Sequence, residues 1–347
     1  MTDFALRVIA WQKQHGRHDL PWQNTINPYV IWVSEIMLQQ TQVTAVIGYF
    51  LRFMVRFPDI ASLANATQEE VLQYWSGLGY YSRARNLHQA AQKITRDFSG
   101  IFPHQFSDIL SLSGIGRSTA AAISTFAFNI PQPILDGNVK RVFARHFLIE
   151  GWTGTPKIEA QLWQIAELHM PTIDASPYTQ GLMDLGATIC TRTKPKCQVC
   201  PLLSSCGAYI HKRESKLPTP KPRKPIPLKQ TTMLILRCGN EILLEKRPSN
   251  GIWGGLWSFP EIEAHEIATE IAYSKFGLNV EPEEPLENIE HAFTHFKLAI
   301  TPQPLIVLYQ PKRLVSNTIW LPIEDAIDAA IPAPVRGILN KLNMSQS

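Results

Sequence analysis

A proline-rich basic segment divides this chain of 347 residues into two parts. Residues 211–230 read HKRESKLPTPKPRKPIPLKQ and contain five prolines and seven lysines or arginines. Proline cannot continue a helix or occupy a central strand, so this segment does not belong to the interior of a packed domain. Chains of this length usually form more than one domain. We therefore expect two domains, residues 1–210 and 231–347, joined by an extended linker.

Charge is distributed unevenly over the chain. Residues 1–213 contain 19 Lys/Arg and 14 Asp/Glu, residues 214–230 contain five and one, and residues 231–347 contain nine and 14, for net charges of +5, +4 and −5. A basic first part weakly favours contact with a polyanion. The linker is either a plain solvated tether or a tether that also crosses a phosphate backbone.

The hydrophobic pattern changes at the linker. In residues 1–210 apolar side chains recur at three- and four-residue spacing, for example over residues 30–48 and 84–94, which predicts an all-α domain of about ten helices. After the linker, residues 231–237 and 241–246 alternate as strands do, and they flank a tight hairpin at Cys238-Gly239-Asn240. Further strands are expected over residues 295–300 and 305–309, with helices over 264–276 and within 324–342. The second domain is therefore predicted to be a small α+β fold.

No apolar run approaches the ~18–20 residues that span a bilayer. The first residues contain no apolar core followed by a small-residue cleavage site, and no transit or nuclear signal is visible. We expect a monomeric protein of the bacterial cytoplasm, associated with the nucleoid.

Four of the five cysteines lie within 17 residues, with the spacing Cys190-x6-Cys197-x2-Cys200-x5-Cys206. Such crowding argues against a disulfide framework and for a metal centre in a reducing compartment. Structural zinc sites more often separate two C-x2-C pairs by a dozen or more residues, so we favour a [4Fe–4S] cluster over a four-cysteine zinc site. Three basic residues between the first two cysteines can offset cluster charge and contact phosphate: Arg192, Lys194 and Lys196.

A glycine pair lies in Leu112-Ser113-Gly114-Ile115-Gly116-Arg117-Ser118-Thr119, between two helical patterns. The glycines permit a tight turn and close backbone approach, and the next helix begins with free N–H groups. This arrangement can bind a DNA phosphate without reading base sequence. Most such pairs are ordinary helix–helix turns, and that alternative stays open here.

Two carboxylates are candidates for chemistry. Glu35 is the only acid in a mostly apolar stretch that we expect to be helical from residue 27 past residue 48. If it is partly buried, desolvation raises its pKa and makes it a general acid near neutral pH, and otherwise it is paired or exposed. Asp136 precedes a predicted helix and is either an ordinary helix cap or a carboxylate at the mouth of a cleft.

Taken together, the motifs resemble those of the MutY-type adenine DNA glycosylases, over nearly the whole chain. The first domain is similar to the helix-hairpin-helix superfamily that also contains endonuclease III, and the last domain to a Nudix-like domain. Beside the four-cysteine loop at residues 190–206, the resemblance rests on these motifs: LPW (20–22), SEIMLQQTQV (34–43), GLGYYSRARNL (77–87), LSGIGRST (112–119), ILDGNVKR (134–141) and MDLGA (183–187).

The resemblance implies an enzyme that excises adenine mispaired with 8-oxoguanine or guanine in double-stranded DNA, by hydrolysis of the N-glycosidic bond. Glu35 matches the acid that protonates the departing adenine, at N7. Asp136 matches the carboxylate that stabilises the oxocarbenium-like sugar, and Asn138 matches a residue that positions the sugar or water. The flipped adenine leaves the base stack and enters a pocket.

Other matches concern DNA contacts. Gln180 and Asp184 match residues near the adenine edge, and Gln40 and Tyr80 match side chains that wedge into the duplex, supported by Leu78. Gly114 and Gly116 belong to the DNA-binding hairpin. Ser118 stands where the lyase members carry a lysine nucleophile, which implies a monofunctional glycosylase because a hydroxyl cannot form a Schiff base.

The last domain resembles one that senses 8-oxoguanine. Its lesion-sensing loop matches Phe293, Thr294 and His295, with Thr294 in place of the usual serine. The metal-binding pair of a Nudix box is replaced by Tyr273 and Ser274, so we expect no nucleotide hydrolysis.

Three alternatives remain open at this point. One is a thymine mismatch glycosylase or an endonuclease III-type lyase, which Ser118 and the last domain disfavour. The second is a non-catalytic reader of damage, which Glu35 and Asp136 disfavour. The third is a nucleotide pyrophosphohydrolase, which the missing metal-binding pair disfavours.

Overall fold

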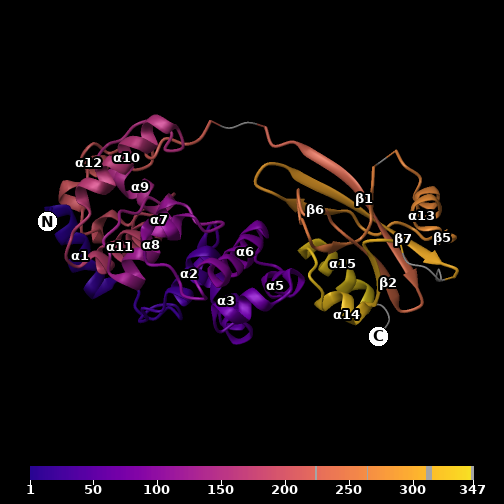
Figure 1. Ribbon diagram of the computed structural model, residues 1–347. Helices are drawn as coiled ribbons and strands as arrows, with labels where there is room; N and C mark the ends of the chain where they lie inside the picture. The colour runs from indigo at the N-terminus through magenta and orange to yellow at the C-terminus, as the bar shows by residue number, and fades with distance from the viewer. Residues whose placement is uncertain (223–224, 264, 310–314, 345–347) are drawn as a thin grey trace. The chain divides into compact units, whose positions relative to one another are not determined.

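The computed structural model shows a helical part followed by a part built on a sheet (Figure 1). Contacts divide the chain into two units, Met1–Asn65 with Asn86–Arg223 and Ala66–Arg85 with Lys224–Ser347. The structure describes residues 1–222, 225–263, 265–309 and 315–344. Residues 223 and 224 of the predicted linker and residue 264 of a predicted helix lie outside these ranges. No helix in the described ranges is both long enough and apolar enough to cross a membrane.

The predicted all-α fold of the first part is confirmed. Its α-helices are α1 (Asp3–His15), α2 (Pro28–Leu38), α3 (Val43–Arg56), α4 (Ile60–Asn65), α5 (Gln68–Trp75), α6 (Ser82–Asp97), α7 (Phe106–Leu110), α8 (Arg117–Phe128), α9 (Gly137–His146), α10 (Pro156–His169), α11 (Ala175–Asp184) and α12 (Gly207–Ile210). Helix α11 continues into a π-helical turn, η1 (Leu185–Ile189), and two short 3₁₀ turns follow, η2 (Cys197–Val199) and η3 (Leu203–Ser205). Helix α5 belongs to the second unit by its contacts.

The prediction of a single helix around Glu35, from residue 27 past residue 48, is wrong. The apolar stretch forms two helices, because α2 ends at Leu38 and α3 begins only at Val43. Gln40 between them has a φ of 57°, which no right-handed helix can contain. No glycine or proline marks this break, so the hydrophobic pattern could not reveal it. As a result Glu35 lies in the last turns of α2, and Gln40 lies in an exposed turn.

The core of the first unit joins helices that are distant in sequence. Helix α1 packs against α11 and contributes Phe4 and Val8 to a cluster with Phe143 and Leu182. Gly181 permits this close approach, because a Cβ atom there would lie 2.8 Å from Cγ1 of Val8. This packing fixes the position of α11, which carries two of the predicted site residues, Gln180 and Asp184.

His146 in this core makes the first unit sensitive to acid. It is 9% exposed and its ring lies 4.8 Å from that of Phe4. Burial, aided by the charges of His169 and Arg7, lowers the pKa of His146 to about 4. The unfolded chain, with a pKa of ~6.5, binds this proton more readily, so folding free energy is lost as the pH falls from ~6.5 towards 4.

We therefore expect the thermal midpoint to fall by roughly 5 °C between pH 7 and pH 5 through this group, since the linked free energy is on the order of 2 kcal/mol. His146→Leu should lose that part of the pH dependence, as measured by thermal melts at both pH values. The exposed His15→Leu variant is the matched control and should behave as the wild type. An unchanged pH dependence in His146→Leu would contradict the assignment.

The predicted α+β fold of the second part is confirmed. A mixed sheet has the order β3-β2-β1-β7-β5, with β4 paired to β1, β6 to β7 and β8 to β2. The expected hairpin is present, but Cys238 belongs to β1 and pairs with Glu241, so the turn itself consists of Gly239 and Asn240. The strands are β1 (Leu228–Cys238), β2 (Glu241–Lys246), β3 (Trp257–Ser258), β4 (Glu261–Ile262), β5 (Val280–Pro282), β6 (Ile289–Ala292), β7 (Lys297–Val307) and β8 (Thr318–Pro322), and the helices are α13 (Ala268–Phe276), α14 (Ile323–Asp328) and α15 (Ala333–Met344).

The two strands predicted over residues 295–300 and 305–309 are in fact one strand, β7. It pairs in parallel with β1 from Lys297 to Ile306, although it contains Pro302 and Pro304. These prolines have no N–H to donate, but their carbonyl oxygens accept from Leu286 and Glu283. The strand therefore continues through residues that the sequence pattern treats as a break.

Candidate active site and cysteine loop

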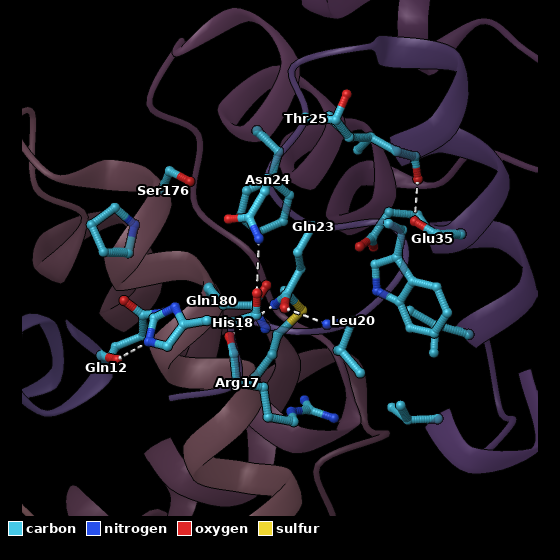
Figure 2. Close-up of a pocket in the computed structure, with 18 of the residues that line it drawn as sticks. Gln12, Arg17, His18, Leu20, Gln23, Asn24, Thr25, Glu35, Ser176 and Gln180 are labelled. Carbon is cyan, nitrogen blue, oxygen red and sulfur yellow. Dashed lines mark hydrogen bonds between the residues drawn. The ribbon is translucent and has the colours of Figure 1, made fainter. Parts of the chain in front are cut away.

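A cavity of about 510 Å³ lies within the first unit and is large enough for a small ligand. It is bounded by the end of α1, the loop that follows it, α2 and α11. Figure 2 shows Glu35 on one side of the space and Ser176 with Gln180 on the opposite side. Apolar side chains such as Trp22, Ile31 and Phe126 share the lining with these polar groups.

Glu35 has the electrostatics of a general acid. Burial raises its pKa to about 7, and the negative charge of Asp136 adds to the effect. A carboxyl group with this pKa is protonated in a large fraction of molecules at neutral pH, so it can donate a proton there. The influence of Asp136 also shows that the structure brings the two predicted carboxylates together, although they are about a hundred residues apart in sequence.

Asp136 has the first of the two roles considered for it, that of a helix cap, and it is not among the residues that line the cavity. It caps the N-terminus of α9, with Oδ1 accepting from the backbone N–H of Val139 at 2.7 Å and Oδ2 accepting from Nδ2 of Asn138 at 3.3 Å. Burial raises the pKa of Asp136, against these hydrogen bonds and the charge of Arg141. The cap therefore holds a carboxylate in a fixed place, beside the other acid.

Asn138 and Arg141 connect this carboxylate to the cysteine loop. Nη2 of Arg141 donates to Oδ1 of Asn138 at 2.8 Å and to the carbonyl of Gly186 at 2.6 Å, and Nε donates to the carbonyl of Cys190 at 2.7 Å. Gly186 must be small here, because a Cβ atom would lie 2.5 Å from that of Asn138. The predicted site residue Asn138 is thus held by hydrogen bonds on both sides.

Gln180 and Asp184 have different positions. Gln180 lines the cavity, whereas Asp184 is fully buried behind it. The carboxylate of Asp184 accepts from Nε2 of Gln180 at 2.8 Å, and it pairs with Arg17 through the backbone N–H at 2.9 Å and the guanidinium at 2.6 Å. Asp184 therefore orients two cavity residues and does not itself line the cavity.

Ser118 and the glycine hairpin lie at the start of α8. Oγ of Ser118 accepts from the backbone N–H of Leu135 at 3.0 Å, which fixes the segment that leads into Asp136. Gly114 has a φ of 79°, and a Cβ atom there would lie 2.8 Å from that of Asn86. Gly116 is the N-cap of α8 with an extended backbone, so only Gly114 requires glycine by its conformation.

The proposed wedge residues occupy unusual backbone conformations. Gln40 in the first unit and Tyr80 in the second have φ values of 57° and 50°, in a region that few non-glycine residues adopt. Tyr80 is 43% exposed, whereas Leu78 is 7% exposed and packs inward. Exposed side chains on constrained turns suit insertion into a partner, and a buried Leu78 suits support.

The predicted lesion-sensing residues border a second cavity, of about 330 Å³, within the second unit. Phe293 and Thr294 line it together with Tyr80 and Trp253, and Oγ1 of Thr294 lies 2.9 Å from the hydroxyl of Tyr80. The ring of Phe293 stacks on that of Phe296 at 4.6 Å. His295 is exposed beside this cavity's lining residues.

The four cysteines of the loop, Cys190, Cys197, Cys200 and Cys206, line one small cavity and form no disulfide. In the part of the chain that the structure describes, no three cysteine, histidine or acidic side chains are arranged to hold a single metal ion. Burial raises the pKa of the Cys200 thiol to about 12, and the neighbouring cysteines add to it. The basic residues within the loop are exposed to solvent: Arg192, Lys194 and Lys196.

Sequence reasoning missed several cavity residues. Gln12, Arg17, His18 and Ser176 line the cavity without having been singled out. Arg17 and His18 lie three and two residues before the motif LPW, whose Leu20 and Trp22 also line the cavity. That motif was therefore the available signal, whereas nothing in the local sequence marks Ser176.

Comparison with family models supports both parts of the architecture. Residues 33–168 match the HhH-GPD superfamily base excision DNA repair protein, and residues 231–341 match the NUDIX domain. A thermostable thymine-DNA glycosylase superimposes with a TM-score of 0.53 at 29% identity, over 60% of this chain and 95% of that one. Endonuclease III bound non-covalently to DNA gives a TM-score of 0.52 at 21% identity over the same shares, which supports the fold alone.

Full-length relatives extend the match to the whole chain. The adenine DNA glycosylase of Buchnera aphidicola subsp. Acyrthosiphon pisum is 41% identical over 338 residues, covering 97% of this chain and 96% of the relative. The adenine DNA glycosylase of Rattus norvegicus is 31% identical over 402 residues, covering 97% and 77%. The chain therefore belongs to the adenine DNA glycosylase family.

Proposed function

We propose that this protein is a base excision repair enzyme that binds double-stranded DNA and removes adenine mispaired with 8-oxoguanine or guanine. The observation that carries the proposal is Glu35, whose pKa is raised to about 7 at the wall of a cavity of about 510 Å³, close to Asp136. The relatives' name supplies the base, adenine. The mispair partner and the mechanism below are our inference from the residues.

The chemistry follows from the two carboxyl groups. Adenine leaves the duplex and enters the cavity, at a cost of a few kcal/mol in lost stacking. The protonated Glu35 donates its proton to N7 of the base, which makes adenine a better leaving group. The negative charge of Asp136 stabilises the cationic sugar that forms, or its carboxylate bonds to the sugar carbon as a covalent intermediate. Water then attacks that carbon and completes the hydrolysis. Asn138 holds that carboxylate in place through its 3.3 Å hydrogen bond.

Ser118 supports a monofunctional enzyme. Its hydroxyl accepts the backbone hydrogen bond from Leu135 and offers no amine for attack on the sugar. Lys140, which follows Asp136 in the same helix, is held in an ion pair with Glu159 at 2.7 Å. We therefore infer that abasic DNA is the product and that strand cleavage needs added alkali.

The second unit is proposed to contact the base opposite adenine. The cavity bounded by Tyr80, Trp253, Phe293 and Thr294 offers aromatic surfaces and two hydroxyl groups, which can stack on a base and hydrogen-bond to its edge. Thr294 keeps the hydroxyl that the family's usual serine provides. The imidazole of His295 is exposed next to Thr294, where it can also contact the DNA.

The four-cysteine loop is proposed to hold a [4Fe–4S] cluster. Four thiols around one cavity provide the donor set, and their arrangement suits a polynuclear centre better than a single ion. The cluster, when bound, neutralises and orders the thiolates of the loop. Exposed Arg192, Lys194 and Lys196 would then present positive charge to the DNA backbone.

Single-turnover kinetics test the proposed substrate. With a duplex carrying adenine opposite 8-oxoguanine, we expect fast adenine release, with strand breaks only after alkali treatment. Adenine opposite guanine should also react, while A:T and T:G duplexes should release base at least ~100-fold more slowly, because discrimination by buried polar contacts is commonly of that size. Equal rates on A:T, or strand breaks that appear with base release before alkali is added, would contradict the proposal.

A further inference from the structure

Arg145 is a buried charged residue to which the proposed reaction gives no part. It lies in the last turn of α9 and is 3% exposed. Its guanidinium donates to the sulfur of Cys190 at 3.3 Å and to the carbonyl oxygens of Thr191 at 2.7 Å and Arg192 at 3.0 Å. One side chain thus holds the first cysteine of the loop and the two residues that follow it.

The same guanidinium reaches the start of the linker. Nε of Arg145 donates to the carbonyl of Leu217 at 2.8 Å, and the Leu217 side chain is itself buried. The next residues stay on the first unit, because Oγ1 of Thr219 accepts from the backbone N–H of Gly151 at 3.0 Å and Lys221 lies over the ring of Trp152 at 5.2 Å. The linker is therefore anchored to the first unit at residues 217–221.

The charge of Arg145 points to a negative partner. Three of its acceptors are neutral carbonyl oxygens, and a buried guanidinium with only neutral acceptors is unfavourable. The fourth acceptor is a sulfur, which becomes a thiolate when it ligates metal. A loaded cysteine loop would therefore strengthen the hydrogen bond to Cys190 and hold the guanidinium in the orientation that also binds Leu217.

We propose that Arg145 is a positioning residue that couples loading of the cysteine loop to anchoring of the linker on the first unit. The proposal rests on the [4Fe–4S] assignment made above. Loss of the cluster should loosen residues 217–221, and loss of Arg145 should weaken both the cluster and the anchor.

Limited trypsin digestion reads the anchor directly. Trypsin cleaves after Lys216, and the next residue, Leu217, is buried and accepts a hydrogen bond from Arg145. Cleavage of the Lys216–Leu217 peptide bond therefore requires local unfolding of this segment. Wild-type protein with its cluster should resist cleavage there. Wild-type protein stripped of iron, and loaded Arg145→Met, should each be cut about tenfold faster, the factor that one charge-assisted hydrogen bond commonly provides.

Spectroscopy reads the cluster independently of adenine release. In Arg145→Met the visible absorbance of the cluster should bleach roughly tenfold faster under a chelator, and its reduction potential should be lower because an N–H donor to sulfur is lost. Arg145→Lys keeps the charge but cannot reach all four acceptors, so it should be intermediate. Arg7→Met is the matched control, since Arg7 donates to the hydroxyl of Ser204 within the loop but to neither a cysteine sulfur nor the linker.

The outcomes separate the two proposals. Wild-type protein that binds no iron would overturn the cluster assignment and this inference together. Iron-loaded wild type and Arg145→Met with equal cleavage and equal bleaching would overturn this inference alone. If Arg145→Met fails to fold, the comparison of loaded with stripped wild type decides, and equal cleavage of those two forms also overturns the coupling.

Discussion

Glu35→Gln should release adenine about 10³-fold more slowly than the wild type in single-turnover experiments, because proton transfer by a positioned acid commonly contributes 10²–10⁴-fold. Glutamine has nearly the same shape and lines the cavity in the same way, but it has no proton to give to N7. The variant should still bind a duplex with adenine opposite 8-oxoguanine, with a Kd within a few-fold of the wild type. Retained binding would show that the loss is chemical.

The pH dependence of the rate of adenine release gives a second test of Glu35, because the direction of the change is predicted. The acid must be protonated to act, and its pKa is raised to about 7, so the wild-type rate constant should fall above that pH, by about tenfold per unit. Glu35→Gln should lack this fall. Glu167→Gln, which removes an exposed carboxyl group of the same unit, is the matched control and should keep both the rate and the profile. Equal, slow release by wild type and Glu35→Gln would instead favour a non-catalytic reader of damage.

Asp136→Asn should lose about 10³-fold in rate, the effect expected when one preorganised charge is removed from a site of transition-state charge. Asparagine is also a good N-cap, so the acceptor for the N–H of Val139 remains and the thermal midpoint should change by only a few degrees. Asp136→Ala should show the same loss in the rate of adenine release. It should also lose about 1 kcal/mol of folding free energy, because the N-cap is removed as well.

The same substitution should shift the profile of Glu35. The charge of Asp136 raises the pKa of Glu35, so the residual activity of Asp136→Asn should begin to fall at a lower pH than that of the wild type. A rate within tenfold of wild type, with an unmoved profile, would contradict the role given to this carboxylate. Thermal melts of both variants establish that the comparison is made between folded proteins.

Local sequence patterns predicted much of the fold because local forces decide those features. The change from helical spacing to alternation marked the two parts, and the segment Cys238-Gly239-Asn240 predicted the hairpin that joins β1 and β2. The place of Asp136 before a helical pattern made a cap one of its two possible roles, and the structure shows the cap. The spacing of the cysteines required one compact loop, and the structure brings all four to one cavity. Each of these depends on a few neighbouring residues, which the sequence shows directly.

Other features depend on neighbours that the sequence does not reveal. Strand β7 continues through its prolines because it pairs with β1, which is distant in sequence. The break at Gln40, with its φ of 57°, has no glycine or proline to mark it in the local pattern. Asp184 looked like a cavity residue, but the fold buries it behind Gln180 and Arg17.

The sequence by itself determined the family and the order of the two parts, and it singled out the four cysteines that we propose as cluster ligands and the two carboxylates that we propose for catalysis. Only the tertiary structure decided what those carboxylates can do. The pKa of Glu35 depends on its burial and on the charge of Asp136, which is about a hundred residues away in the sequence. In the same way, only the fold brings Arg145, Cys190 and Leu217 together. Desolvation and charge interactions act through space, so residue identity alone could not predict their strength.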